Sequence, residues 1–288
     1  MIQYIQRKDL DIKKYDSCIQ NSLNPRIYAL SDYLDIVVDH WDAIVFKDYQ
    51  AVMPIPWRSK YLIKYIYPPC WTQQLGVFSI DSFDANLIEI FLKAIPKKFL
   101  KTTLQFNNKC SHEQFTPRTN FVLKLNKSYQ NIQQGYKKNR KDGIKKFIKS
   151  GYSIQENINI VDVIDLFKEN YANEVKINFQ DYAKLQKLTQ KKKLQPITFG
   201  VLDESNHLVS GSVFFKDEKR IYYVFSANNN KGNKVEGNTA ILNHMIASYS
   251  NSGYTLDFEG SMHPGIASFF KSFGSVSEIY YEYTRQLF

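Results

Sequence analysis

The sequence predicts an α/β protein with a mixed sheet, built as two tandem domains over residues 1–119 and 120–288. Helical and strand patterns alternate along the chain, and the order of elements in the first half recurs in the second. The hairpin patterns at residues 43–56 and 197–215 occupy the same place in their halves. With 288 residues, of which 43% are hydrophobic, each half is large enough to bury a core. We therefore interpret the chain as an internal structural duplication.

In the first half, two helical patterns precede a strand meander. Apolar residues at three- and four-residue steps predict helices over residues 9–22 and 27–38, separated by Asn24-Pro25. The segments predicted after them are strands 43–46, 51–57 and 61–67, helix 81–93 and strand 100–106. Pro54 and Pro56 place strand 51–57 at a sheet edge or around a bulge, because proline donates no ladder hydrogen bond.

The second half repeats this order. The predicted segments are strand 120–125, helices 132–149, 161–171 and 179–194, strands 197–202, 208–215 and 221–226, helix 240–250, strand 255–258, a helix starting at 264 and strand 277–287. A long polar loop over residues 226–238 feeds helix 240–250. Pro264 suits the first position of a helix, and Gly274 suits a helix C-terminus.

The predicted helix 132–149 carries lysines at positions 137, 141, 145 and 149, which form one ridge. The simplest interpretation is a solvated face. The alternative is a surface that attracts an anionic substrate, with Arg140 and Lys141 as binding residues. Arg140 is the best single candidate, because its planar guanidinium fits carboxylate or phosphate oxygens.

The loop before helix 240–250 is a candidate site for an anionic cofactor. Free backbone N–H groups and the positive end of the helix dipole suit a pyrophosphate. The candidate binding residues are Lys231, Gly232, Asn233, Gly237, Asn238 and Thr239. The chain has no Walker A or GxGxxG spacing, which disfavours ATP and dinucleotide enzymes. The alternative is a plain surface loop with Asn238 or Thr239 as an N-cap.

Acidic, hydroxyl and imidazole side chains gather in residues 257–263 and could supply acid–base chemistry and oxyanion support. The candidate catalytic residues are Asp257, Glu259 and His263, and the further substrate-binding candidates are Gly260, Ser261 and Phe270. For His263 a surface or helix-entry position is the alternative, and Glu259 could simply accept a bond from a loop N–H. The five histidines have no ligand spacing, so no metal is expected.

Composition limits the class of protein and its partners. The net charge of +10 and the pI near 9.2 favour anionic partners such as phosphates, nucleic acid, anionic lipid or nucleotide-linked substrates. The three cysteines are widely spaced, which indicates reduced thiols in a cytoplasm. The sequence shows neither an apolar signal-peptide core nor a membrane-spanning run, so we expect a soluble cytoplasmic protein.

The order of elements in the second half resembles the GNAT acyltransferase fold, and the duplication resembles the FemABX group, which carries two GNAT-like domains in tandem. The segment Tyr136-Lys137-Lys138-Asn139-Arg140-Lys141-Asp142-Gly143-Ile144-Lys145-Lys146 is similar to the basic helix of that group. The stretches Asp257-Phe258-Glu259-Gly260-Ser261 and Phe269-Phe270-Lys271-Ser272-Phe273-Gly274 look like its C-terminal signature. The resemblance covers residues 120–288 well and the first half by architecture alone.

The resemblance implies transfer of an acyl or aminoacyl group to an amine, with the acceptor in the cleft between the two halves. In GNAT-like enzymes the donor thioester carries a pyrophosphate, which here would lie at Lys231 to Thr239, so acyl-CoA or CoA is the expected cofactor. FemABX enzymes instead use aminoacyl-tRNA and extend peptidoglycan precursors. The charge of +10 favours this alternative. The chain has no long heptad counterpart of the helical arm that some of them insert, which favours acyl-CoA. A third possibility is a non-catalytic module that binds an anionic glycan or nucleic acid.

Overall fold

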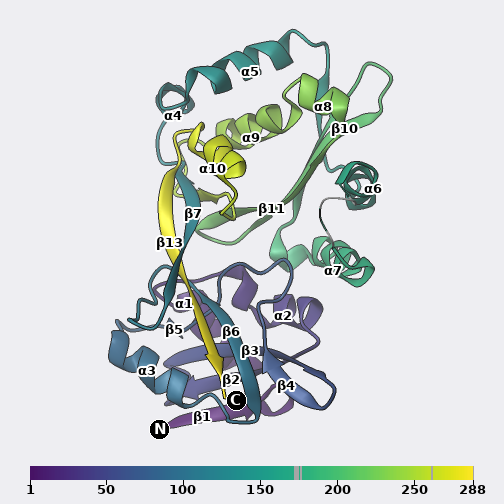
Figure 1. Cartoon of the computed structure of the whole chain (residues 1–288). Coiled ribbons are helices and arrows are strands. Elements are labelled where there is room, and N and C mark those ends of the chain that lie inside the picture. Colours follow the sequence, from purple (N-terminus) through teal and green to yellow (C-terminus); the bar gives the residue numbers. More distant parts are fainter. Residues whose placement is uncertain (172–174, 176, 261, 288) are drawn as a thin grey trace. The chain divides into compact units, whose positions relative to one another are not determined.

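In the computed structural model the chain divides into two compact units, Met1–Thr119 with Ile279–Phe288, and Asn120–Glu278 (Figure 1). The structure describes residues 1–171, 175, 177–260 and 262–287. Each unit combines helices with a mixed sheet, which confirms the predicted α/β class. The last residues belong with the first unit because their strand pairs with a strand of that unit.

The first unit contains a meander of mostly antiparallel strands. Its elements are β1 (Ile2–Gln6), η1 (Arg7–Asp9), α1 (Ile12–Asn21), η2 (Ile27–Ala29), α2 (Ser31–Val37), β2 (His40–Phe46), β3 (Ala51–Lys60), β4 (Ile63–Ile66), β5 (Phe78–Ser79), α3 (Ala85–Lys93) and β6 (Phe99–Phe106), followed by β13 (Val276–Gln286) from the end of the chain. The strand order is β1-β2-β3-β4-β6-β13, with β5 on β3, and β4 pairs with β6 in parallel. Strands β1 and β5 were not predicted from the sequence.

The single helix predicted over residues 27–38 is wrong. A short 3-10 turn ends before Leu30, which has extended backbone angles, and α2 starts at Ser31. The carboxylate of Asp16, on α1, accepts a hydrogen bond from the Ser31 backbone N–H at 2.9 Å and another from its hydroxyl at 2.6 Å. A contact from a distant part of the sequence therefore decides where this helix begins.

Strand β3 is an internal strand, so the edge position predicted from Pro54 and Pro56 is wrong. Strand β2 covers one side of it from Ala51 to Trp57. On the other side, β5 pairs only with Ala51 and Val52, and β4 pairs only from Trp57 onward. The Pro56 carbonyl accepts from the Tyr67 N–H on that second side. Because the nitrogen and the carbonyl of one strand residue point to the same side, the Pro56 nitrogen faces the second side as well. Both prolines therefore place their missing N–H in the interval between β5 and β4.

The turn that joins β3 to β4 consists of Tyr61 and Leu62, so the predicted strand 61–67 begins later, at Ile63. Lys60 pairs with Ile63, which leaves a two-residue loop. Tyr61 has φ 50° and Leu62 has φ 66°, both in the left-handed region. Such a turn favours Asn-Gly, and a bulky residue there costs about 1–2 kcal/mol.

The second unit places strands and helices in the order of the predicted GNAT-like half. Its elements are β7 (Thr116–Lys124), α4 (Tyr129–Gln134), α5 (Lys138–Ile148), β8 (Ser153–Glu156), α6 (Ile160–Tyr171), α7 (Phe179–Thr189), η3 (Lys192–Leu194), β9 (Ile197–Leu202), β10 (Leu208–Lys216), β11 (Arg220–Asn228), α8 (Asn230–Lys234), α9 (Gly237–Ser248), β12 (Thr255–Asp257) and α10 (Pro264–Lys271). The strand order is β7-β12-β11-β10-β9-β8, and β11 pairs with β12 in parallel. Strand β8 was not predicted.

The continuous helix predicted over residues 132–149 is wrong, because the chain breaks between α4 and α5. The Lys137 backbone N–H donates to the Ser272 carbonyl at 2.9 Å, and the Tyr136 ring packs against Phe273 at 5.3 Å. These contacts with the end of α10 hold residues 135–137 outside the helix. Lys137 and Lys149 therefore flank α5 as its caps, so the predicted lysine ridge is shorter than expected.

The long polar loop predicted over residues 226–238 is mostly regular structure. Strand β11 continues to Asn228, and the short helix α8 follows, with the Asn229 side chain accepting the Gly232 N–H at 2.9 Å. Helix α9 begins at Gly237, earlier than the predicted start at 240. This shift brings Gly237 to the beginning of a long helix, whereas Gly232 lies within α8.

The alternation of side chains along β10 explains both glycines. Ser210 lies against α8 and α9, whereas Gly211 lies against Val163 of α6. A Cβ on Gly232 would lie 2.1 Å from the Val209 carbonyl oxygen, and a Cβ on Gly237 would lie 2.0 Å from Ser210 Oγ. Both glycines are required because helix backbone approaches strand closely there.

We expect Gly237→Ala to lower the free energy of unfolding by about 2 kcal/mol, because its methyl group has no room beside Ser210. Ser210→Gly removes the obstructing atoms and should recover most of the loss in the double variant. Gly253→Ala is the matched control, because a Cβ at that position meets nothing within 4 Å. Urea denaturation of the four variants checks this, and a double variant as unstable as Gly237→Ala would contradict it.

Asp203, in the turn between β9 and β10, is expected to make the folding stability of the protein depend on pH in the acidic range. Its pKa is lowered to about 2, chiefly because Lys231 donates to it and also because it accepts the backbone N–H groups of His207 and Ser205. An unfolded aspartate has a pKa near 3.9, so the stabilisation exists above about pH 4 and is lost as the pH falls through about 2.

We therefore expect Asp203→Asn to melt at a lower temperature than the parent protein at pH 6, with a difference that has become small at pH 2. Thermal melting between these values measures the difference. A gap that stays constant down to pH 2 would show that the carboxylate charge is not its cause.

Candidate functional site

A pocket of about 290 Å³ opens at the beginning of α9 in the second unit. Its lining residues come from α5, the end of β11, α8, α9 and α10 (Figure 1). They are Arg140, Asn228, Gly232, Asn233, Glu236, Gly237, Asn238, Thr239 and Phe269. The structure thus brings together most of the predicted cofactor-binding residues with Arg140, although donor binding by them stays a prediction.

The first turn of α9 supplies backbone donors to this pocket. Glu236 has φ 62° and precedes the helix, and the first internal bond runs from the Ala240 N–H to the Glu236 carbonyl at 2.9 Å. In the described part of the chain no side chain caps the amides of Gly237, Asn238 and Thr239. Uncapped amides at the positive end of a helix favour an anion.

Arg140 brings a buried positive charge to the same pocket. Its side chain is held on two sides, by α9 and by the aromatic rings of α10. One terminal nitrogen donates to Glu236 Oε2 at 3.0 Å and to the Thr239 hydroxyl. The guanidinium lies 4.9 Å from the Phe269 ring centre.

The residue is only 8% exposed, and its Nε has no hydrogen-bond partner among the described residues. A buried, unsatisfied N–H costs free energy, so a ligand acceptor at this nitrogen would be stabilised.

Three lining residues were missed from the sequence: Asn228, Glu236 and Phe269. Glu236 accepts from Arg140 and also from the Thr239 hydroxyl at 2.7 Å, and its carboxylate offsets part of the Arg140 charge. The Asn228 side-chain oxygen is buried without a hydrogen-bond partner in the described residues. Glu236 directly precedes the first glycine of the helix, and that position was the signal available for it.

No protein-family model and no curated protein matches this sequence, but solved structures do. FemX superposes with a TM-score of 0.69 over 94% of this chain and 96% of that chain, at 12% identity. L-PGS from Bacillus licheniformis gives 0.59 over 96% and 92%, at 12% identity. These superpositions show that the chain has the FemABX/GNAT-like fold predicted from the sequence. N-myristoyltransferase from Saccharomyces cerevisiae, solved with bound myristoyl-CoA, gives 0.51 over 98% and 82%, at 11% identity.

Within this FemABX/GNAT-like fold, the parallel strands β11 and β12 lead to the candidate sites. They pair only from Arg220 opposite Thr255 to Tyr222 opposite Asp257. Strand β12 then ends, whereas β11 continues to Asn228 at the pocket. Ligands in α/β folds bind beyond the carboxyl ends of strands, which is where this pocket lies.

Other predicted binding residues do not line the pocket. Lys231 Nζ contacts Asp203 at 2.8 Å, and Lys141 Nζ donates to the Gln134 carbonyl at 3.1 Å. Phe270 is 5% exposed and stacks on Phe258 at 4.9 Å within the hydrophobic core. These contacts give each of the three residues a structural role, and their roles in binding stay predictions.

Asp257 lies in a buried ion-pair network. Arg220 contacts it at 2.7 Å and also contacts Glu278 at 2.8 Å. Burial alone would lower the pKa of Arg220, but the charges of Asp257 and Glu278 outweigh it and raise the pKa above its usual value. Asp257 is 1% exposed and also accepts from the Asn120 side chain at 2.8 Å and from the Glu259 N–H at 3.0 Å. These contacts hold the turn that follows β12.

The remaining candidates lie on that turn. Glu259 has φ 61° and Gly260 has φ 56°, so the chain reverses sharply before α10. His263 is exposed and precedes α10, and Pro264 takes the first helical position, as predicted. Ser261 lies outside the described residues. The catalytic roles of Glu259 and His263 stay predictions.

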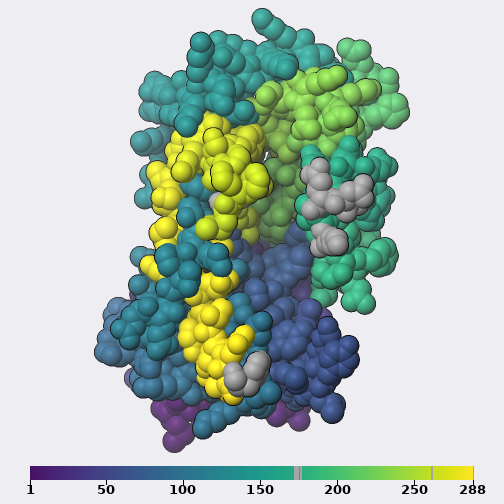
Figure 2. Space-filling model, in the orientation of Figure 1, coloured from purple at the N-terminus to yellow at the C-terminus, as the bar shows by residue number. Residues whose placement is uncertain are grey.

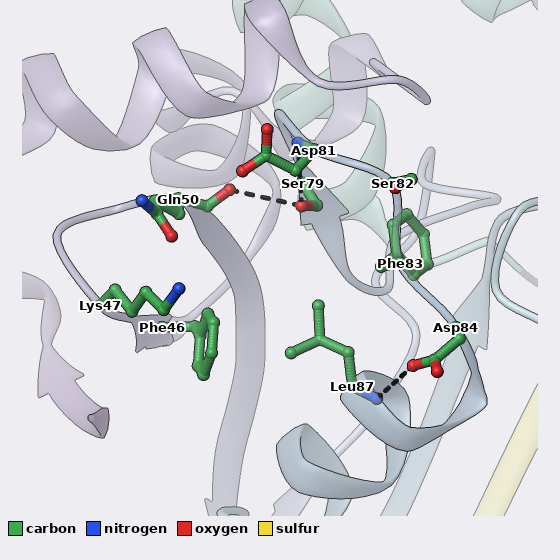
Figure 3. Close-up of a pocket in the computed structure, with 9 residues that line it drawn as sticks. All are labelled: Phe46, Lys47, Gln50, Ser79, Asp81, Ser82, Phe83, Asp84 and Leu87. Carbon is green, nitrogen blue, oxygen red and sulfur yellow. Dashed lines mark hydrogen bonds between the residues drawn. The ribbon is translucent and has the colours of Figure 1, made fainter.

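A larger pocket, of about 470 Å³, lies in the first unit beside the start of α3 (Figure 3). Its polar groups serve the local fold: Ser79 Oγ donates to the Gln50 carbonyl at 3.4 Å, and the Asp84 carboxylate accepts the Leu87 N–H at 3.1 Å. The latter bond lowers the pKa of Asp84. Lys47 and Asp81 add charges of opposite sign, so this pocket selects no ligand class by charge.

Neither a metal-binding group nor a membrane-spanning helix occurs among the described residues. They contain no group of three or more His, Cys, Asp or Glu side chains placed to hold a metal ion. They also contain no helix that is both long enough and apolar enough to cross a membrane.

Proposed function

We propose that the protein is an N-acyltransferase that moves an acyl group from acyl-CoA to an amine. The pocket at the start of α9 carries this proposal, because it combines uncapped helix amides with the buried Arg140 guanidinium. A pyrophosphate offers several anionic oxygens to such a set of donors. The fold supports a transferase of this class, and one structural relative was solved with a bound acyl-CoA.

In the proposed reaction the amine nitrogen attacks the thioester carbonyl, a C–N bond forms, and the C–S bond breaks. CoA leaves as the thiolate, and the amine proton passes to Glu259 or His263. Asp257 acts as a positioning residue, because its carboxylate accepts the Glu259 backbone N–H and is neutralised by Arg220. Substituting the proton acceptor, by Glu259→Gln or His263→Gln, is expected to lower kcat while KM for the donor stays constant.

The second candidate is an aminoacyl-tRNA-dependent transferase that extends a cell-wall precursor. The similarity to FemX and the net charge of +10 favour it. The same amides and Arg140 would then hold a phosphate of the tRNA. The two candidates share the site and differ in the donor.

Calorimetric titration with acetyl-CoA and with S-acetylpantetheine, which lacks the pyrophosphate, tests the proposal. Micromolar binding of acetyl-CoA, about −8 kcal/mol, and at least tenfold weaker binding of S-acetylpantetheine would support it. Equal affinities for acetyl-CoA and S-acetylpantetheine would show that the pocket does not bind the pyrophosphate. Binding of aminoacyl-tRNA without binding of either thioester would favour the second candidate, and no binding of any donor would favour a non-catalytic module.

A further inference from the structure

We propose that the β3–β4 hairpin docks the protein on an anionic membrane surface. The tip of this hairpin is the most exposed apolar segment of the first unit. Leu62 is 98% exposed, Tyr61 is 87% exposed and Ile63 is 47% exposed. The hairpin projects from the sheet of its unit in Figure 1, and its blue surface is open on the side shown in Figure 2. Contiguous exposed apolar side chains indicate a surface that binds a partner.

The geometry of the turn does not explain these residues. Tyr61 and Leu62 both occupy left-handed backbone positions, where asparagine and glycine fit better. Their side chains make no core contact that would offset the strain, since the tip is almost fully exposed. The chain therefore keeps two unfavourable residues at the position that presents them best to a partner.

Positive charges surround the apolar tip. Lys60 lies directly before it, with Nζ 5.5 Å from the Tyr61 ring, and Lys64 lies directly after it, with Nζ 4.8 Å from the Trp57 ring. The segment from Trp57 to Tyr67 contains no acidic residue. Arg58, lower in the hairpin, pairs with Asp39 at 3.1 Å. The net charge at the tip is thus carried by the two lysines.

This combination fits a lipid surface better than a nucleic acid. Anionic headgroups attract lysines over about one Debye length, roughly 10 Å at 0.1 M salt. The side chains of Leu62 and Ile63 gain nothing from a phosphate backbone, but they gain from burial at the level of the acyl chains. Tyrosine and tryptophan rings, as at Tyr61, Tyr65 and Trp57, are enriched at membrane interfaces. This inference does not depend on the proposed enzymatic activity.

The test is sedimentation of the full-length protein with vesicles. One set contains phosphatidylcholine mixed with the anionic lipid phosphatidylglycerol, and the other contains phosphatidylcholine alone. We expect binding to the anionic vesicles that falls as salt rises, and at least tenfold weaker binding to the neutral ones.

The decisive variant is Tyr61→Asn with Leu62→Gly, which installs the favoured turn sequence and removes the apolar tip. We expect it to melt at or above the temperature of the parent protein and to bind anionic vesicles at least tenfold more weakly. Lys60→Gln with Lys64→Gln should remove the preference for anionic lipid. Leu23→Asn, at another exposed apolar residue of the same unit (54% exposed), is the matched control and should bind like the parent.

The proposal is overturned if the parent protein binds neither set of vesicles, or if the Tyr61→Asn, Leu62→Gly variant binds as well as the parent. It is also overturned if transfer RNA displaces the protein from vesicles and the lysine variant loses RNA binding while the apolar-tip variant keeps it. That result would identify the hairpin as a nucleic-acid contact.

Discussion

Replacing Arg220 by methionine is expected to lower the free energy of unfolding by about 3–5 kcal/mol, the loss typical of one partner removed from a buried ion pair. Arg220 is the cation between two carboxylates, and one of them, Asp257, is 1% exposed. Methionine preserves much of the side-chain volume, so the effect reports the uncompensated charge rather than a cavity.

Urea denaturation provides the measurement, and Arg118→Met provides the matched control. Arg118 also pairs with a glutamate, Glu282, at 2.6 Å, but its side chain is 33% exposed, compared with 13% for Arg220. The control should lose about 1 kcal/mol or less. Adding Asp257→Asn and Glu278→Gln to Arg220→Met should recover part of the loss. If both arginine variants lose equal stability, burial does not determine how strongly the Arg220 network stabilises the protein.

Replacing Arg140 by alanine is expected to weaken binding of the proposed CoA donor by about 100-fold, or about 2.7 kcal/mol. The substitution removes a buried cation from the pocket and leaves the Glu236 carboxylate next to the anionic donor. The donor loses its attraction to Arg140 and is repelled by Glu236, so the loss of affinity exceeds that caused by removing one surface charge. Arg140→Lys should fall between the two proteins, because it keeps the charge and loses the planar fork.

Calorimetry with the same donor measures this effect, and Lys231→Ala is the comparison, because Lys231 is also a predicted binding residue. Lys231 is also basic and lies in the same segment as the pocket residues, but its Nζ contacts Asp203 instead. We expect its affinity to change by less than about threefold, as for an exposed ion pair. In Arg140→Ala, the added change Glu236→Gln should restore part of the affinity. A larger loss for Lys231→Ala than for Arg140→Ala would place the anion elsewhere.

Periodicity and turn residues predicted the type and order of most elements, because these depend on local burial patterns. The predicted strand 197–202 matches β9, and Pro264 begins α10 as expected. The errors lie where distant residues decide the local structure. Asp16 starts α2 at Ser31, and the Ser272 carbonyl holds Lys137 outside α5. Neither contact can be inferred from the local pattern of apolar and polar residues.

The candidate site was predictable to the extent that it consists of backbone groups. Glycines and polar residues before a helix indicated the amides of Gly237, Asn238 and Thr239. The side chains were harder to assign, because their partners come from other elements. Lys231 contacts a carboxylate in the β9–β10 turn, and Glu236 contacts an arginine on α5. No spacing rule in the sequence links these pairs.

The pairing of β13 with β6 has a consequence for biosynthesis. Tyr281 to Gln286 cover one edge of β6, between Phe106 and Lys101, and they are synthesised long after β6 itself. The second unit is continuous from Asn120 to Glu278, whereas the first unit needs both ends of the sequence. A nascent chain that ends before residue 279 therefore has this edge of β6 uncovered, and uncovered strand edges recruit other chains. We expect the unit encoded second to complete its folding first, and the unit encoded first to depend on chaperones until Tyr281 to Gln286 have been synthesised.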